Sequence, residues 1–435
     1  MFGLKHSVES REHTASYYAA TANQKTNYPK LESTIKTDVV VVGGGFSGVN
    51  TALELAERGY AVVLLEANRI AWGATGRNGG QVIGGIGSKD PETFEKSIGK
   101  KGVKTVYEMG FEAGEIIRER VAKYNINCDL KWGYCDVAIK PRHMKDFQDW
   151  QAHAEKVGNP HKLQILDANE IKQYVGSDKY IGGLLNATGN GHIHPLNLCI
   201  GEAEAAANLG VEIYEQSRVI AIKHGERVNV STDNGSVNAK YLVLGGNAYM
   251  GDLVPKMSKK ILPSSTSVIA TAALSDDLAK QVMPADIAVC DTRTALDYFR
   301  LSADKRLLFG GLSNYTGMEP TDLKGVMRKK MLKVFPQLED IDVDYAWSGQ
   351  MGIGMNRMPQ MGRLADNVFY VQAYSGHGVA PTHIMSRAIA EMIDGKPERF
   401  DIFTKIPHWS IPGGKLLRRP GMALGMMYYK LLDEF

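Results

Sequence analysis

The chain of 435 residues is long enough to bury large cores and predicts two or more domains. Its 51 basic and 48 acidic side chains nearly balance and are interspersed, which argues against a nucleic-acid partner. Four scattered cysteines predict neither a metal site nor a disulfide framework, and a reducing cytoplasm is the expected compartment. The polar N-terminus does not resemble a signal peptide, and no apolar run approaches the ~20 residues that span a bilayer.

The most informative segment lies at residues 38–66. A valine-rich run at 38–42 leads into Gly-Gly-Gly-Phe-Ser-Gly, and the helical pattern that follows ends at Gly59. A second apolar run, 61–65, ends on Glu66. A strand, a Gly-x-Gly-x-x-Gly turn, a helix, a second strand and an acidic residue together form the fingerprint of a dinucleotide-binding βαβ unit.

Each part of this unit has a physical task. Gly43 permits a tight turn, Gly45 allows a pyrophosphate to approach the backbone, and Gly48 lets the helix pack on the strand. The helix start directs free N–H groups at the phosphates, and the Glu66 carboxylate can accept hydrogen bonds from a ribose diol. The predicted contacts are therefore Gly43, Gly45, Phe46, Ser47, Gly48 and Glu66.

Small residues dominate the next segment, 67–81. This segment resembles the flavin-contacting segment of FAD amine oxidases in the D-amino-acid oxidase superfamily, although a flexible surface loop is the alternative. Small side chains would let the chain run beside the pyrophosphate and the ring system, and Arg77 and Asn78 would add donors. The predicted contacts are Ala67, Gly73, Ala74, Thr75, Arg77, Asn78, Gly79, Gly80 and Gln81.

The middle of the chain has clear periodic segments. Apolar positions at helical spacing predict a helix over 103–124 and another over 196–209, where Gly210 ends the pattern. Short strands are predicted at 219–222 and 241–244.

A third glycine-rich element lies near the C-terminus. Residues 367–374 predict a strand, and 382–393 have helical character. A glycine turn between them can place backbone donors and a positive helix end against the N1–C2=O edge of a flavin. The predicted contacts in this turn are Gly376, His377, Gly378 and Val379.

Four further segments extend the resemblance over nearly the whole chain: 16–23, 191–198, 246–249 and 357–364. With the glycine segments, they resemble the bacterial γ-glutamylputrescine oxidoreductases, in the glycine oxidase and sarcosine oxidase branch of the D-amino-acid oxidase superfamily. The resemblance implies FAD as cofactor, with Val219 at the adenine and Gly246 among the cofactor contacts. No cysteine lies near Gly376, which favours non-covalent binding.

The resemblance also implies an α/β fold with two domains. The Rossmann-like FAD-binding domain should be discontinuous, and the substrate domain should contain a mainly antiparallel sheet with helices. The predicted boundaries are 1–92, 186–250 and 352–435 for the FAD-binding domain, and 93–185 and 251–351 for the substrate domain. The helix at 103–124 is then the clearest helix of the substrate domain.

The Gly-x-Gly-x-x-Gly pattern occurs once, which favours an organic substrate over a nicotinamide as electron donor. The resemblance implies an amine that transfers hydride from its α-carbon to flavin N5. The resulting imine would hydrolyse to an aldehyde and ammonia, and oxygen or another acceptor would take the electrons. With oxygen, the product would be hydrogen peroxide. The protein would mainly orient and desolvate the substrate.

The substrate class depends on one arginine. Amino-acid oxidases of this branch hold the substrate carboxylate with an arginine a few residues before Pro-x-x-Gly. Here that region, near Ile353 or Gly354, is uncharged, and Arg357 falls later. A primary amine such as the putrescine end of γ-glutamylputrescine is therefore favoured. The alternatives are a sarcosine- or pipecolate-like oxidase, in which Arg300, Arg357 or another base holds a carboxylate, and a non-catalytic flavin-binding sensor.

Aromatic walls suit a methylene chain, and each candidate for the substrate pocket has core packing or a backbone contact as its alternative role. The candidates are Tyr249, Tyr298, Arg300, Trp347, Gln350, Tyr374 and His377. His192 and His194 are expected to pack beside Pro195 rather than bind a metal. The apolar segment 421–432 predicts a terminal helix docked on the core, with weak peripheral membrane contact as the alternative. The electron acceptor and the oligomeric state stay open.

Overall fold

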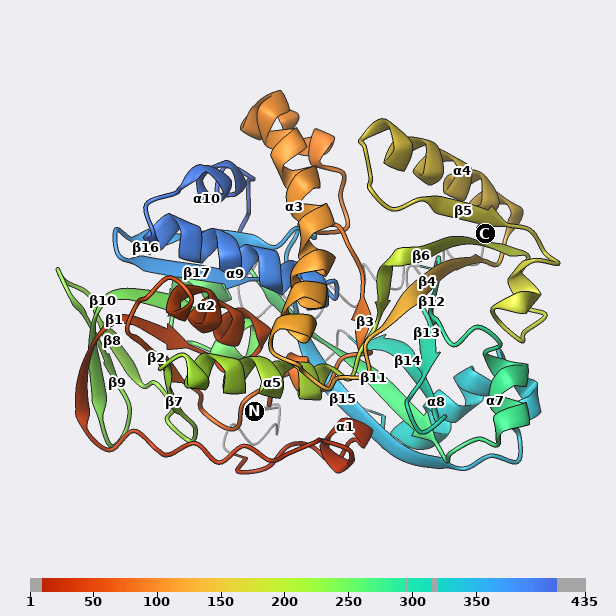
Figure 1. The fold of residues 1–435 in the computed structure, drawn as a ribbon, viewed down its shortest axis with the longest axis horizontal. Coiled ribbons are helices and arrows are strands. Elements are labelled where there is room, and N and C mark those ends of the chain that lie inside the picture. Colours follow the sequence, from red (N-terminus) through yellow and green to blue (C-terminus); the bar gives the residue numbers. More distant parts are fainter. Residues whose placement is uncertain (1–9, 294–295, 315–319, 413–435) are drawn as a thin grey trace.

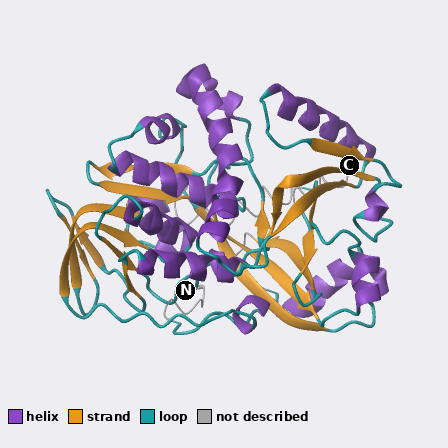
Figure 2. Cartoon of the chain, in the orientation of Figure 1, coloured by secondary structure: helices purple, strands orange, loops and turns teal. Residues whose placement is uncertain are grey.

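The computed structural model describes residues 10–293, 296–314 and 320–412 as two β-sheets with helices packed against both (Figures 1 and 2). The segments 421–432 and 1–9 lie outside the described residues. Within the described part of the chain, no helix combines the length and the apolar character that crossing a membrane requires.

The first sheet has a parallel centre. Its strand order is β16 (Gln360–Ala365), β17 (Val368–Gln372), β10 (Ser236–Leu244), β1 (Thr34–Val42), β2 (Val62–Leu65) and β7 (Glu212–Tyr214). The edge strand β16 is antiparallel to β17, while the other neighbours in this order are parallel. On the other side of β10's N-terminal half, β9 (Val228–Ser231) pairs antiparallel and carries β8 (Ala221–Lys223).

Helices cover one face of this sheet, and the β8–β9 hairpin covers part of the other. The helices are α2 (Phe46–Ala56), α5 (Pro195–Asn208) and α9 (Val379–Ile393), with α3 (Glu95–Lys123) packed on α9. Coverage of both faces explains why β1 and β2 read as unbroken valine and leucine runs, because both faces of a strand in a parallel sheet are buried.

The second sheet is mainly antiparallel and lies to the right in Figure 1. Its order is β15 (Val343–Ile353), β11 (Leu262–Thr271), β14 (Leu307–Asn314), β13 (Tyr298–Leu301), β12 (Ala288–Asp291), β4 (Lys131–Ala138), β6 (Gly182–His192) and β3 (Gln81–Val82). Strand β5 (Leu163–Leu166) pairs with β6, and only the β12–β4 pair is parallel among the described pairs of this sheet. Helices α7 (Asp276–Val282) and α8 (Leu323–Leu332) cover one face, and α4 (Pro141–Lys156) covers the β5 end of the other. Short helices α1 (Tyr17–Ala20), α6 (Pro255–Ser258) and α10 (Glu398–Phe403) complete the α-helices of the described residues.

This architecture confirms the predicted α/β class. The helices predicted at 103–124 and 196–209 correspond to α3 and α5, although α3 begins earlier and bends at Gly99. One assignment needs correction, because α3 packs mainly on α9 of the first layer rather than on the second sheet. The strand predicted from Val219 begins at Ala221. The domain boundaries remain a prediction, since β6 and β15 both run across a predicted boundary.

A buried ionic cluster joins three of the helices on the first sheet. Glu54 of α2 accepts hydrogen bonds from Arg120 of α3 at 2.6 Å and from Arg387 of α9 at 2.9 Å. Burial alone would raise the pKa of Glu54, but these two guanidinium groups bring that pKa below its usual value. The cluster therefore fixes the packing of α2, the helix that follows the glycine turn.

We expect Arg120→Met to lower the free energy of unfolding by ~3–5 kcal/mol, because it removes the most buried of the guanidinium groups that pair with the Glu54 carboxylate. Denaturant unfolding at pH 7 measures this loss. The matched control is Lys104→Met, which breaks an exposed pair with Glu108 and should cost under ~1 kcal/mol. Equal losses for the two variants would contradict the proposed role of the cluster.

Candidate functional site

The turn between β1 and α2 starts a helix whose N-cap residue has no side chain to cap it. Gly43 has a φ of +111°, a conformation that favours glycine. Helix α2 begins at Phe46, and its N-cap, Gly45, offers no side-chain hydrogen bond. A Cβ on Gly48 would lie 1.7 Å from the Gly43 carbonyl oxygen, so the helix reaches the strand only with glycine here. The turn therefore presents a helix N-terminus suited to a phosphate.

Glu66 lies at the end of β2, beside this turn. Its carboxylate accepts hydrogen bonds from the Gly44 N–H at 2.6 Å and from the Asn68 N–H at 2.8 Å. Burial raises the pKa of Glu66 to about 7, against the opposite effect of these donors. The side chain is still partly exposed, and its remaining lone pairs can accept hydroxyl groups.

The small-residue segment runs between aromatic rings. A Cβ on Gly79 would lie 2.3 Å from the Tyr298 ring, and one on Gly73 would lie 3.2 Å from the Tyr249 ring. Thr75 ties the segment to the glycine turn, because its hydroxyl accepts the Phe46 N–H at 3.0 Å. Larger side chains at these glycines would force the segment away from the rings, and the loop alternative is therefore disfavoured.

Polar side chains of this segment bond to carbonyl groups of the protein, and their predicted contacts with the cofactor remain a prediction. Arg77 is buried and stacks on Trp72, and its Nε donates to the Trp72 carbonyl at 3.0 Å. Asn78 donates to the carbonyls of Ala74 and Thr75. Gln81 donates to the Val289 carbonyl at 2.9 Å. These hydrogen bonds hold the segment in its conformation. The backbone and the small side chains of the segment are then the groups expected to face a ligand.

The C-terminal turn lies beside the N-terminal one. The Tyr374 hydroxyl lies 2.9 Å from the Ser47 hydroxyl, and α9 begins at Val379 with Gly378 as an uncapped N-cap. His377 lies 3.0 Å from the Gly84 carbonyl through Nε2. A carbonyl only accepts, so Nε2 carries the proton, and burial lowers the pKa of this ring. Segments more than three hundred residues apart thus form one site.

Residues near the C-terminal ends of the strands complete this site, among them those that follow β10. Gly246 lies against Gly43, because a Cβ added to Gly43 would lie 3.0 Å from the Gly246 nitrogen. Val219 is nearly buried in the apolar cluster that contains Val42 and Leu65. Sequence reasoning missed Asn247, whose side-chain oxygen accepts the Ala373 N–H at 3.0 Å and joins the ends of β10 and β17. The Gly-Asn pair directly after a predicted strand was the available signal.

The substrate-pocket candidates divide into two groups. Tyr249, Tyr298 and Gln350 are partly exposed, and the Gln350 N–H donates to the Tyr249 hydroxyl at 2.9 Å. Trp347 is buried, and its Nε1 donates to the Arg77 carbonyl at 2.9 Å. Tyr374 and Arg300 are also buried, with polar groups bonded to protein atoms. These last three residues therefore pack and position the site rather than line a pocket.

The two histidines near Pro195 serve packing and capping. His194 is the N-cap of α5, and its Nδ1 accepts the Asn197 N–H. His192 is buried, and its Nε2 lies 3.3 Å from the Asp286 carbonyl. Among the described residues, no group of three or more His, Cys, Asp or Glu side chains could hold a metal ion.

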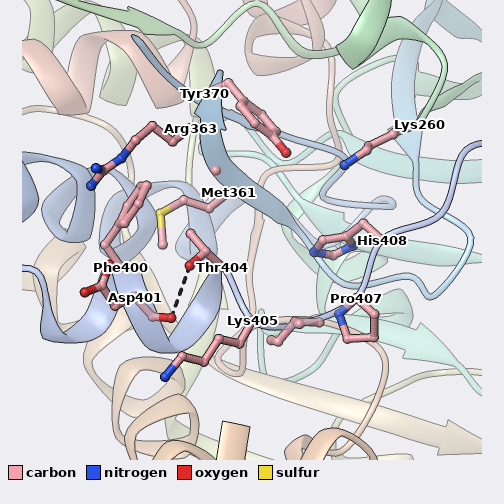
Figure 3. Close-up of a pocket in the computed structure, with 12 residues that line it drawn as sticks. Lys260, Met361, Arg363, Tyr370, Phe400, Asp401, Thr404, Lys405, Pro407 and His408 are labelled. Carbon is pink, nitrogen blue, oxygen red and sulfur yellow. Dashed lines mark hydrogen bonds between the residues drawn. The ribbon is translucent and has the colours of Figure 1, made fainter. Parts of the chain in front are cut away.

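A separate surface pocket of about 540 Å³ lies between the first sheet's edge and α10 (Figure 3). Tyr370 from β17, Arg363 from β16 and Thr404 after α10 surround it together with Lys260 and His408. It shares no residue with the predicted cofactor contacts, and it therefore is not the site described above.

Comparisons with known proteins agree with this geometry. The model of the DAO family, FAD dependent oxidoreductase, matches residues 38–392. Gamma-glutamylputrescine oxidoreductase of Escherichia coli K12 is 47% identical over 97% of this chain and 99% of its own length. Probable oxidoreductase OrdL of Haemophilus influenzae is 40% identical over 98% of each chain. The solved glycine oxidase of Bacillus cereus has a TM-score of 0.71 at 20% identity, covering 87% of this chain and 99% of its own.

The chain therefore belongs to the DAO family of FAD-dependent oxidoreductases. It is an enzyme that uses FAD, and its two sheets correspond to a Rossmann-like FAD-binding domain and a substrate domain. The residues present fit the cofactor, because two helix starts with glycine N-caps, the Glu66 carboxylate and a glycine-rich backbone meet at one place. FAD bound there would supply two-electron redox chemistry, and the protein would supply its orientation.

We expect Gly48→Ala to raise the FAD dissociation constant about 10-fold or more, since the added methyl must push the Gly43 carbonyl out of the turn. Fluorescence titration of FAD-free protein measures this constant. Gly59→Ala is the control on the same βαβ unit, because no atom lies within 4 Å of its Cβ position and only its positive φ adds strain. Unchanged FAD binding in Gly48→Ala would contradict the role of this close approach.

Glu66→Gln tests the raised pKa of Glu66 through the pH dependence of stability. A raised folded-state pKa gives stability that is present below the ordinary value of 4.5 and is lost as pH rises through about 7. We expect the stability of FAD-free Glu66→Gln, relative to wild type, to increase by about 1–3 kcal/mol between pH 5 and pH 8. Urea unfolding at both pH values measures the change. The exposed Glu108→Gln control should show no such trend.

Proposed function

We propose that this enzyme oxidises a primary amine at the end of a longer chain, with γ-glutamylputrescine as the preferred substrate. The name of the 47% identical relative supports this substrate, since the two chains align over nearly their whole lengths. The proposal rests on the burial and hydrogen bonding of Arg300. Of the two candidate arginines, Arg300 is the one with a hydrogen bond, among the described residues, to the small-residue segment 67–81, called the flavin segment below.

Arg300 has no free face for a substrate carboxylate. Its side chain is 3% exposed and donates to the carbonyls of Gly79 at 2.9 Å and Ile193 at 2.7 Å. It also donates to the Leu301 carbonyl at 3.0 Å and to the Tyr18 hydroxyl at 3.2 Å. A bidentate clamp needs two exposed N–H groups on one edge of the guanidinium, which this burial excludes. A substrate without a carboxylate on its reacting carbon suits such a site.

The proposed reaction converts the amine, oxygen and water into an aldehyde, ammonia and hydrogen peroxide. FAD, held non-covalently, would accept hydride from the α-carbon at N5. Tyr249 and Tyr298 supply aromatic walls that exclude water and pack on methylene groups. Neutral His377 holds the C-terminal turn in place through Gly84. Free, buried thiols at all four cysteines support a reducing compartment such as the cytoplasm.

Arg357 is the residue on which a sarcosine- or pipecolate-like activity would depend. It lies in the turn between β15 and β16 with a φ of +57°. The Arg357 carbonyl lies 3.1 Å from the Cβ position of Gly87, which places this turn beside the segment that follows β3.

We expect γ-glutamylputrescine to bleach the flavin absorbance of the anaerobic enzyme at concentrations at least ~100-fold lower than sarcosine or pipecolate, because the buried Arg300 has no free edge for their carboxylates. Absorbance at the flavin band during titration measures this. Arg357→Met should leave the titration with γ-glutamylputrescine unchanged. Preferential reduction by the amino acids, lost in Arg357→Met, would establish the second activity instead. Failure of every amine to bleach the flavin would favour a non-catalytic sensor.

A further inference from the structure

One face of the second sheet carries a row of side chains that leads away from the flavin segment. Tyr298 of β13, Cys290 of β12 and Asp136 of β4 are register partners on neighbouring strands. Register partners project to the same face of a sheet. The opposite face at this level, represented by Phe299 and Cys135, packs into the apolar core under α7 and α8. Asp136 therefore lies on the same face as Tyr298.

Asp136 is a carboxylate without a cation. Its Oδ1 accepts a hydrogen bond from the Tyr134 hydroxyl at 2.8 Å, and no basic side chain among the described residues pairs with it. Tyr134, Cys290 and Tyr298 belong to the small apolar cluster on this face. Burial raises the pKa of Asp136 to about 7, yet the side chain stays partly exposed. A desolvated carboxylate with one phenol as its partner is costly unless a cation compensates it.

The position of Asp136 separates it from the reacting end of a substrate. Tyr298 contacts Gly79 of the flavin segment, and Asp136 lies two strands further along the sheet (Figure 1). Two inter-strand steps of ~4.8 Å place the two side chains about 10 Å apart along this face. The reacting amine must be neutral to release hydride, so a carboxylate beside it would oppose the reaction by favouring the ammonium form.

We propose that Asp136 binds an ammonium group at the far end of the amine substrate. This inference rests on the proposed function and deepens it. In γ-glutamylputrescine, about nine bonds join the reacting carbon to the α-ammonium of the glutamyl group. An extended chain covers ~3.3–3.6 Å for every three backbone bonds, so this separation is roughly 10 Å. The methylene chain between them then crosses Tyr298, the partly exposed apolar member of the row. Asp136 determines specificity for amines that carry a second, distant cation.

The test compares two substrates and two variants of the FAD-loaded enzyme. γ-Glutamylputrescine carries the distal ammonium, and its α-N-acetyl derivative lacks this charge. We expect Asp136→Asn to raise KM for γ-glutamylputrescine about 10- to 100-fold with little change in kcat, and to leave KM for the acetylated compound within about twofold. Asp178→Asn, which changes a carboxylate that is 93% exposed, should alter neither constant.

Wild-type enzyme provides a second test that needs no variant. Its KM for the acetylated compound should exceed that for γ-glutamylputrescine by a factor similar to the Asp136→Asn effect. Flavin absorbance and the melting temperature verify folding, and Asp136→Asn should fold because it removes a charge that has no cationic partner among the described residues. Equal KM values for both compounds in wild type, or equal effects of Asp136→Asn on both, would overturn the inference while the amine oxidase activity stands. If no amine reduces the wild-type flavin, the proposed function fails and the inference fails with it.

Discussion

The close approach of two backbone segments at Gly43 and Gly48 is the constraint on which the cofactor site depends. The helix α2 meets its strand with the Gly43 carbonyl where a side chain at Gly48 would lie. This contact sets the direction of the helix start, and the ends of β2 and β10 lie at the same edge. Because the sheet is parallel there, the carboxyl ends of its strands and the turns that follow them gather into one crevice.

The second sheet is connected to this crevice through rings and glycines. Tyr298 and Tyr249 lie against Gly79 and Gly73, so the flavin segment passes between the two sheets with little free space. Behind the first layer, the Glu54 cluster fixes the helix that carries the uncapped N–H groups. The glycine turns and the Glu54 cluster thus hold the cofactor side in place, and the specificity that we propose lies on the face with Tyr298 and Asp136.

Local patterns were sufficient to predict FAD as the cofactor from sequence, while the individual contact residues remain a prediction. The turn at Gly43–Gly48, the small-residue segment and the turn at Gly376 each have a spacing that follows from backbone geometry. Burial of Trp347 and Arg300 could not be predicted, because it depends on contacts with Arg77, Tyr18 and Ile193 from distant segments. The proposed role of Asp136 had no local signal either, because it depends on the register of three strands that places Asp136 on the same face as Tyr298.

The buried guanidinium of Arg300 has a consequence for how ligands enter. It hydrogen bonds the second sheet to the flavin segment through Gly79 and to the start of α5 through Ile193. A hinge that swung the two layers apart would have to break the hydrogen bonds of this buried charge. Displacement of the connecting loops is then a less costly route for substrate and product than separation of the two sheets.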